Sequence, residues 1–69
     1  VLVGDLPKYG LAAGDIGTVV LVHKSGAGYE VEFTTLAGDT IAVVTLSASQ
    51  VREAESSEIA HARELARAV

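Results

Sequence analysis

The sequence contains no cysteine, so a disulfide framework, a cysteine metal site and a thiol nucleophile are all excluded. With 69 residues, the chain has room for one domain. A domain of this size buries only about 60% of its unfolded surface and commonly needs a disulfide, a metal or oligomerisation for stability. The absence of cysteine leaves tight packing and oligomerisation. It also fits the reducing environment of the cytoplasm, where we expect the protein to reside.

Basic residues are few and do not cluster. The formal net charge is −4, and the basic residues are Lys8, Lys24, Arg52, Arg63 and Arg67. Nucleic acids and anionic membranes both attract clustered lysine and arginine, so neither partner is expected. The chain has no apolar stretch of the roughly 20 residues that a membrane span requires, and we expect no signal peptide.

Apolar residues are abundant in return. Counted with glycine, they make up 39 of the 69 residues, or about 57%, whereas typical domains contain about 45–50%. This much apolar surface is difficult to hide inside one small core, so we expect a homo-oligomer. The alternative is a compact monomer, in which 11 alanines and 10 valines merely raise the mean hydropathy of +0.40.

Five segments have the pattern of short β-strands: residues 1–3, 18–22, 29–33, 40–46 and 51–52. Residues 29–33 alternate most clearly, with Tyr29, Val31 and Phe33 on the core face and Glu30 and Glu32 facing water. Residues 18–22 are apolar on both faces, so one face should meet the core and the other should be covered by a helix or a partner. With glycine-containing turns and a single 3₁₀ turn at residues 47–50, these strands suggest a small five-stranded barrel over residues 1–55.

The period of the pattern changes after Glu55, and residues 56–69 are predicted to form an amphipathic α-helix. Ser56 or Ser57 is a suitable N-cap, and Glu58 suits the first turn. The apolar residues of this helix fall within one arc of about 120° around its axis. We expect this stripe to pack against the barrel or, together with Leu21, to form an interface between subunits. The stripe consists of Ile59, Ala62, Leu65, Ala66 and Val69.

Three runs of residues resemble a bacterial family known only as a domain of unknown function. They are Leu6-Pro7-x-x-Gly10-Leu11-x-x-Gly14-Asp15-Ile16-Gly17-Thr18-Val19-Val20, then Tyr29-Glu30-Val31-Glu32-Phe33, then Gly38-x-Thr40-x-Ala42-x-Val44-Thr45-Leu46. The resemblance covers about residues 2–53, and some members of that family are similar to proteins carried on mobile gene cassettes (integrons). It implies an SH3-like barrel and no catalytic residues. Residues 14–19 are also similar to the strand opening of KOW-type barrels.

Candidate catalytic and metal-binding residues are isolated in the sequence. His23 and His61 have no spacing typical of a metal site, so solvated histidines are the favoured interpretation. A serine–histidine–aspartate arrangement could be drawn from Ser25, His23 and Asp39, but no strained nucleophile turn surrounds it. Glu30 and Glu32 could act as acid and base, but an exposed pair on a strand more commonly serves solubility. We expect no metal, no cofactor and no enzymatic activity.

Two residues are candidates for ligand contact, Tyr9 and Asp15. Asp15 could receive a ligand cation, whereas its favoured role is a hydrogen bond to the backbone of its own turn. Tyr9 could line a peptide groove, but with three aromatic residues in the chain its packing over the barrel mouth is favoured.

The composition and pattern favour a non-enzymatic protein-interaction or self-assembly module. One alternative is an accessory barrel that completes another protein's complex or active site. Another is KOW-like nucleic-acid or ribosome-associated binding, which rests on analogy of fold and is disfavoured by the acidic charge.

Overall fold

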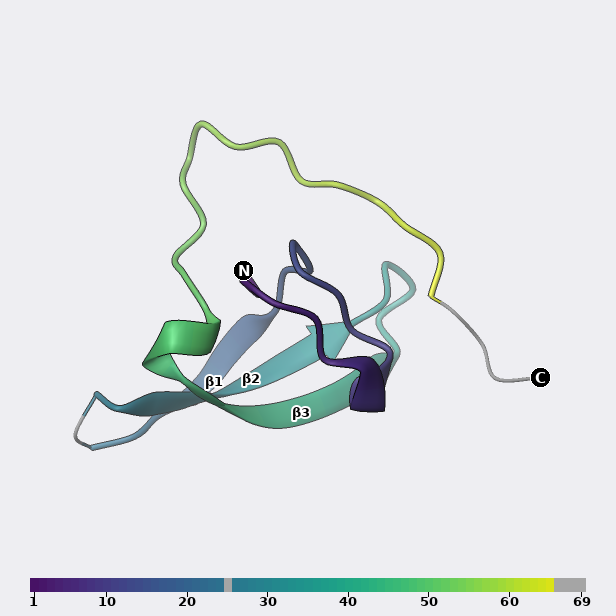
Figure 1. Ribbon diagram of the computed structural model, residues 1–69. Coiled ribbons are helices and arrows are strands. Elements are labelled where there is room, and N and C mark those ends of the chain that lie inside the picture. Colours follow the sequence, from purple (N-terminus) through teal and green to yellow (C-terminus); the bar gives the residue numbers. More distant parts are fainter. Residues whose placement is uncertain (25, 66–69) are drawn as a thin grey trace.

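The computed structural model describes residues 1–24 and 26–65, and its regular part is a three-stranded antiparallel sheet (Figure 1). The strands lie side by side in sequence order, with β1 at Thr18–Val22, β2 at Gly28–Thr34 and β3 at Thr40–Ser47. The protein is therefore mainly β, and the three central strands of the sequence prediction are confirmed. Because β2 is in the middle, β1 lies at one edge of this sheet.

The alternation in β2 divides the sheet into two faces. Val31 and Phe33 are buried and Tyr29 is partly buried, and they lie opposite Val44, Ala42 and Leu46 of β3. The inner face of the sheet therefore forms the core, as predicted. Glu30 and Glu32 lie on the outer face, where they are half-buried by neighbouring side chains rather than fully exposed.

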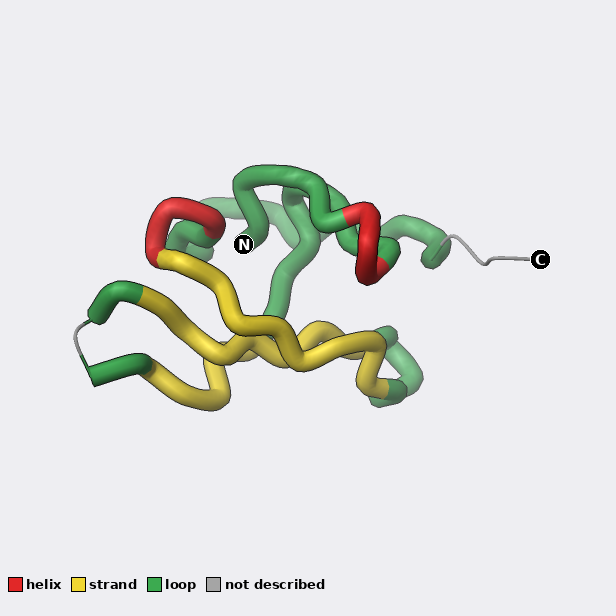
Figure 2. The backbone as a smooth tube through the Cα atoms, turned by 60° about the horizontal axis from the view of Figure 1, so that its bottom comes forward, coloured by secondary structure: helices red, strands yellow, loops and turns green. Residues whose placement is uncertain are grey.

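The N-terminal segment closes the core over this inner face. Six apolar side chains are buried, two of them from the N-terminal segment and four from β2 and β3: Leu2, Leu11, Val31, Phe33, Val44 and Leu46. Leu2 is bound to the loop before β1, since its N–H donates to the Asp15 carbonyl at 2.9 Å and its carbonyl accepts from the Gly14 N–H at 2.8 Å. Residues 1–15 thereby cover the inner face of the sheet (Figure 2).

The prediction of five strands is wrong. Residues 1–3 and 51–52 do not form strands and meet in one isolated antiparallel bridge between Leu2 and Val51. A turn-rich segment begins after residue 3, and the 3₁₀ helix η2 (Ala48–Gln50) ends directly before Val51. Each segment therefore has too few extended residues for a ladder. The predicted 3₁₀ turn itself is confirmed by η2, and a second one, η1, lies at Pro7–Tyr9.

The prediction of an α-helix over residues 56–69 is wrong for residues 56–65, which have no helical structure, while residues 66–69 lie outside the described part. A helix this short is marginal in water unless its apolar stripe packs against a surface. No such surface receives Ile59, which is 94% exposed. Instead, Glu58 binds Arg52 and Arg63 binds Asp15, and these contacts hold the segment in an extended path above the loops (Figure 1).

The expectation that β1 meets the core on one face is also wrong. All five residues of β1 are exposed. Register places Val19 and Val22 on the inner face, opposite Val31 and Tyr29, and Leu21 on the outer face, opposite Glu30. Both faces of this edge strand are open because the predicted helix that would have covered one of them is not formed in residues 56–65.

Candidate functional site

The first candidate site is the apolar edge of the sheet. Five aliphatic side chains on and just before β1 are 50–58% exposed; we call them the β1 patch, and they are Ile16, Val19, Val20, Leu21 and Val22. The predicted interface residue Leu21 belongs to this patch. The pairing register shifts between Val19 and Leu21, so Val20 sits at a bulge.

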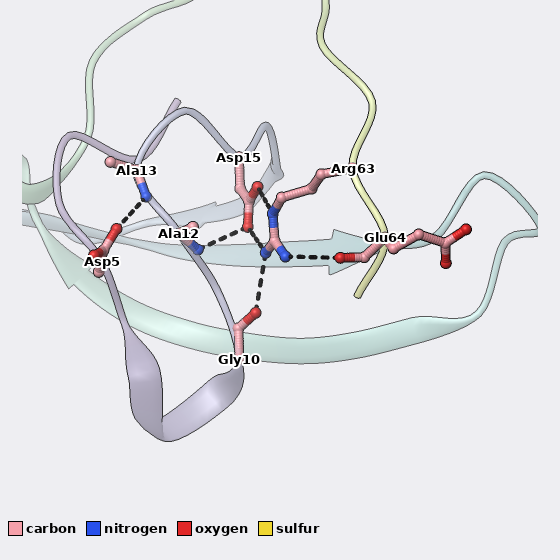
Figure 3. A network of polar contacts seen from close by, with 7 residues as sticks. All are labelled: Asp5, Gly10, Ala12, Ala13, Asp15, Arg63 and Glu64. Carbon is pink, nitrogen blue, oxygen red and sulfur yellow. Dashed lines mark hydrogen bonds and ion pairs between the residues drawn. The ribbon is translucent and has the colours of Figure 1, made fainter. Parts of the chain in front are cut away.

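The second candidate site is a group of oxygen atoms in the loop before β1 (Figure 3). Arg63 Nε donates to Asp15 Oδ1 at 2.8 Å, and its Nη2 donates to Asp15 Oδ2 at 2.5 Å and to the Gly10 carbonyl at 3.0 Å. The Asp15 carboxylate also accepts the Ala12 backbone N–H at 2.9 Å. We call the Asp15 carboxylate and the Gly10 carbonyl the Asp15 site.

The electrostatics of the Asp15 site follow from this pairing. The Arg63 guanidinium lowers the pKa of Asp15, assisted by the Ala12 N–H, while partial burial opposes the shift. The pKa of Arg63 is raised in turn by Asp15 and, more weakly, by the charge of Asp5. The site is therefore an anionic acceptor for a planar cation, in the bidentate geometry that guanidinium and carboxylate groups favour.

One of the two roles considered for Asp15 is confirmed by this arrangement, and its contact with a separate ligand stays a prediction. The predicted hydrogen bond to its own turn is confirmed by the contact with Ala12. The carboxylate also receives a cation, which is supplied by the chain itself from 48 residues away. The sequence analysis did not identify Arg63 as a partner of Asp15, because no local pattern links residues so far apart.

Tyr9 does not join the Asp15 site through any described contact. It lies in η1, is 38% exposed, and has the Lys8 ammonium 5.6 Å from its ring centroid, within the range of a cation–π contact. Its part in ligand contact stays a prediction.

The polar residues of the outer sheet face are paired with one another. His23 Nε2 lies 2.7 Å from Glu30 Oε2, and the Thr45 hydroxyl donates to Glu30 Oε1 at 2.7 Å. Contacts with Thr45 first and His23 second lower the pKa of Glu30. Glu32 likewise accepts from the Thr40 hydroxyl at 2.7 Å. The two glutamates are therefore structural acceptors in this face of the sheet.

The suggested serine–histidine–aspartate arrangement is not brought together. His23 and Asp39 lie in the turns at opposite ends of β2, and seven residues of strand span roughly 20 Å. Ser25 lies outside the described residues. Within residues 1–24 and 26–65, no group of three or more histidine, aspartate or glutamate side chains could hold a metal ion.

The described residues of the predicted helical stripe, Ile59, Ala62 and Leu65, do not form a common buried face. Ile59 and Ala62 are exposed, Leu65 is half-buried next to Gly10, and Ala66 and Val69 lie outside the described residues. A part for these side chains in an interface stays a prediction. In the described part of the chain, no helix is long and apolar enough to cross a membrane.

A separate ion pair holds the segment that leads to Arg63. Arg52 donates to both carboxylate oxygens of Glu58, at 2.7 and 2.6 Å, and Glu58 also accepts the Glu55 backbone N–H at 2.8 Å. An open hollow of about 380 Å³ lies between this segment and the loops, with Gly14 and Ile59 among the residues that line it. The segment is thus attached mainly by its charged side chains.

Acid titration is expected to report on this attachment. The Arg52 contacts lower the pKa of Glu58 from 4.5 to about 2. Because the folded pKa lies below the unfolded value, the pair stabilises the fold above pH 4.5, and this contribution is lost as the pH falls from 4.5 to about 2. Carboxyl ¹³C NMR should show Glu58 titrating in that range, and in Arg52→Gln its midpoint should move towards 4.5. A midpoint near 4.5 in the intact chain would show that the pair does not form in solution.

The fold and the two sites define a small, mainly β domain that presents an apolar sheet edge and an anionic loop site. The chain belongs to the family described as "Domain of unknown function (DUF4926)", whose family model matches residues 1–53. Neither the curated proteins nor the solved structures contain a match to this chain. The β1 patch and the Asp15 site lie within the matched residues, whereas Arg63 follows them.

Proposed function

We propose that this domain is a non-enzymatic protein-interaction module that self-associates through the β1 patch. The observation that carries the proposal is β1 itself, an edge strand with no buried residue and four consecutive aliphatic side chains that are 50–58% exposed. Natural proteins protect a sheet edge with charged residues, proline, a bulge or a covering segment. β1 contains no charged residue and no proline, and the bulge at Val20 is the one such device in it.

A second copy of the chain fits this edge better than an unrelated partner does. A two-fold interface joins the same surface of both subunits, so it must be complementary to itself. A neutral strand meets this condition without repulsion, although each chain has a net charge of −4. Antiparallel pairing of β1 with β1 would satisfy the open backbone groups and cover Leu21 on one face and Val19 and Val22 on the other.

The exposed area of the single chain supports the same proposal. It is 5156 Å², whereas a compact monomer of 7.1 kDa exposes about 4,100 Å². Part of this excess belongs to the extended segment after Arg52. A stable interface buries at least about 1,000 Å² in total, so we expect the contact to extend beyond the strand to the exposed Ile16.

We also infer that the domain has an SH3-like arrangement with much-shortened outer strands. Support comes from the order of its elements: an N-terminal segment, a long loop, three antiparallel strands, a 3₁₀ helix and a final segment that pairs back to the first. In this arrangement Leu2 bonds with residues 14–15 on one side and its segment pairs with Val51 on the other. The link to mobile gene cassettes and the cytoplasmic location stay predictions.

The self-association can be tested by placing a charge on the exposed edge. The intact chain is expected to sediment with twice the mass of the 7.1 kDa monomer in analytical ultracentrifugation. In Leu21→Lys the mass should fall to that of the monomer, because two like charges would meet at the strand pair. The side chain of Leu21 is 56% exposed, so the folded monomer should tolerate the change.

Leu36→Lys is the matched control. Leu36 is fully exposed in the turn between β2 and β3, away from β1, and its substitution should leave the dimer intact. A monomeric intact chain at all concentrations, or equal dissociation by both variants, would disprove assembly through the β1 patch.

A further inference from the structure

The oxygen atoms of the Asp15 site are positioned without help from the segment that occupies it. The Asp15 backbone N–H donates to the Ala12 carbonyl at 3.0 Å, and the Ala12 N–H donates to the Asp15 carboxylate, so the two residues close a small turn on each other. The Asp15 carbonyl accepts from Leu2, which is in the core. All of these groups lie in residues 1–15, and the site is therefore built by the domain itself.

The Gly10 carbonyl is positioned by an equally local device. Gly10 ends η1 in the left-handed region, with φ +70°, and its N–H donates to the Pro7 carbonyl at 3.1 Å. Glycine adopts this left-handed conformation without the steric cost that a β-carbon imposes. The carbonyl is within reach of the same guanidinium nitrogen that contacts Asp15. Three acceptor oxygens from two residues thus converge on one cation.

The side chain of Arg63, which occupies the Asp15 site, indicates what kind of ligand the site accepts. The guanidinium of Arg63 uses two nitrogens for the carboxylate and shares one with the Gly10 carbonyl (Figure 3). A lysine ammonium is a point charge and cannot reproduce this planar fork. Two residues later, the half-buried Leu65 lies beside Gly10, within 3.8 Å of where a β-carbon on that glycine would be.

The occupant is held weakly enough to be replaced. Within residues 56–65, Leu65 alone is half-buried, and the ion pair between Glu58 and Arg52 lies at the beginning of this segment. The Arg52–Glu58 pair is exposed to solvent, and ion pairs of this kind contribute little to stability. The tether supplies a high effective concentration, which keeps the site occupied without tight contacts.

The charge of the domain favours a basic ligand from elsewhere. Residues 1–53 carry six acidic and three basic side chains. Asp5 lies near the Asp15 site, where its carboxylate accepts the Ala13 N–H at 2.9 Å and its charge raises the pKa of Arg63. An arginine that approaches the loop therefore meets two carboxylates, one of them only 13% exposed.

We propose that the Asp15 site is a recognition site for an arginine side chain of an extended peptide segment that carries an aliphatic residue two positions later, and that residues 63–65 occupy it in cis and restrict access. The Asp15 site uses other side chains than the β1 patch, although Ile16 of the patch directly follows Asp15, and separate variants therefore test the two proposals.

The test uses the full chain with Arg63→Ala, which vacates the site. The probe is a fluorescein-labelled peptide with the sequence of residues 58–66, which contains Arg63 and Leu65 but not Arg67. Binding is followed by anisotropy and by the backbone amide shifts of Gly10 and Ala12. The Arg63→Ala chain should bind this peptide at least tenfold more tightly than the intact chain does, because the tethered Arg63 no longer competes. A peptide with lysine in place of Arg63 should bind at least tenfold more weakly to the same chain.

Controls separate recognition from charge and from folding. Adding Asp15→Asn to the Arg63→Ala chain should weaken binding at least tenfold, while adding Asp39→Asn, which removes the same charge from the turn between β2 and β3, should not. Equal binding of the arginine and lysine peptides by the folded Arg63→Ala chain would overturn the proposed recognition. Equal binding by the intact and Arg63→Ala chains would overturn the occupation in cis. The same assays on Leu21→Lys exclude an effect of assembly.

Discussion

Leu46→Ala is expected to remove more than half of the free energy of unfolding. Leu46 is 1% exposed and lies in β3 opposite Tyr29, within the cluster of six buried side chains. Truncation of a buried leucine removes apolar contacts and leaves a cavity, at a cost of about 3 kcal/mol. Small domains have only about 5 kcal/mol of total stability, so this loss is a large fraction of the whole. Urea denaturation followed by circular dichroism should show the midpoint shifting to much lower concentration.

Leu36→Ala is the control for this change. It removes the same atoms from a side chain that is fully exposed, and the free energy of unfolding should change by less than about 0.5 kcal/mol. Equal shifts for Leu46→Ala and Leu36→Ala would show that the buried cluster is not the core in solution.

Gly17→Ala is expected to destabilise the fold by about 1–3 kcal/mol, although it adds one methyl group. A β-carbon at Gly17 would lie 2.5 Å from Val31 Cγ1, 2.9 Å from Phe33 Cε1 and 3.0 Å from the Glu32 carbonyl oxygen. Valine has a stiff side chain, the phenylalanine ring is buried, and the carbonyl belongs to the backbone of β2. The strand must therefore move to accept the methyl group, which thermal denaturation would detect as a lower melting temperature.

Gly4→Ala provides the comparison. A β-carbon at Gly4 would have no neighbouring heavy atom within 4 Å, and this glycine does not adopt a positive φ. Its replacement should be neutral or should stabilise the protein by up to about 1 kcal/mol, because alanine restricts the unfolded chain. If Gly17→Ala behaved like Gly4→Ala, the close approach of residue 17 to β2 would be incorrect.

The β1 patch and the Asp15 site suggest a division of labour within the domain. The patch is neutral and apolar, and it suits an identical surface on another copy. The Asp15 site is anionic and accepts a charged side chain with defined geometry. Leu21→Lys and Arg63→Ala change one of these surfaces each, so their effects on assembly and on peptide binding should be separable.

The central sheet could be predicted from the sequence because its signals are local. Thr18–Val22 is a run of β-branched and aliphatic residues, and the residues of β2 alternate between apolar and acidic. Such patterns depend on the two-residue repeat of a strand and require no knowledge of distant contacts. The 3₁₀ turn after β3 was predictable for the same reason, from a short polar run.

The C-terminal segment could not be predicted in this way. Residues 56–69 have an arc of apolar residues that suits a helix, but a short helix forms only where a surface receives its stripe. The described fold offers Ile59 no such surface, and the segment is held instead through Glu58 and Arg63. The partners of these two residues are six and 48 positions away, and no helical period marks either contact.

The sequence by itself determined the three central strands, the faces of β2 and the exclusion of cysteine chemistry, because these follow from residue type and local period. Only the tertiary structure decided that β1 is an open edge and that Asp15 binds Arg63. It also decided that residues 1–3 and 51–52, predicted as strands, meet in a single bridge. Each of these depends on which segments meet in space and on how few extended residues remain between turns. Contacts across long separations depend on the whole chain, and so the Asp15 site emerges only when the fold brings the loop and the C-terminal segment together.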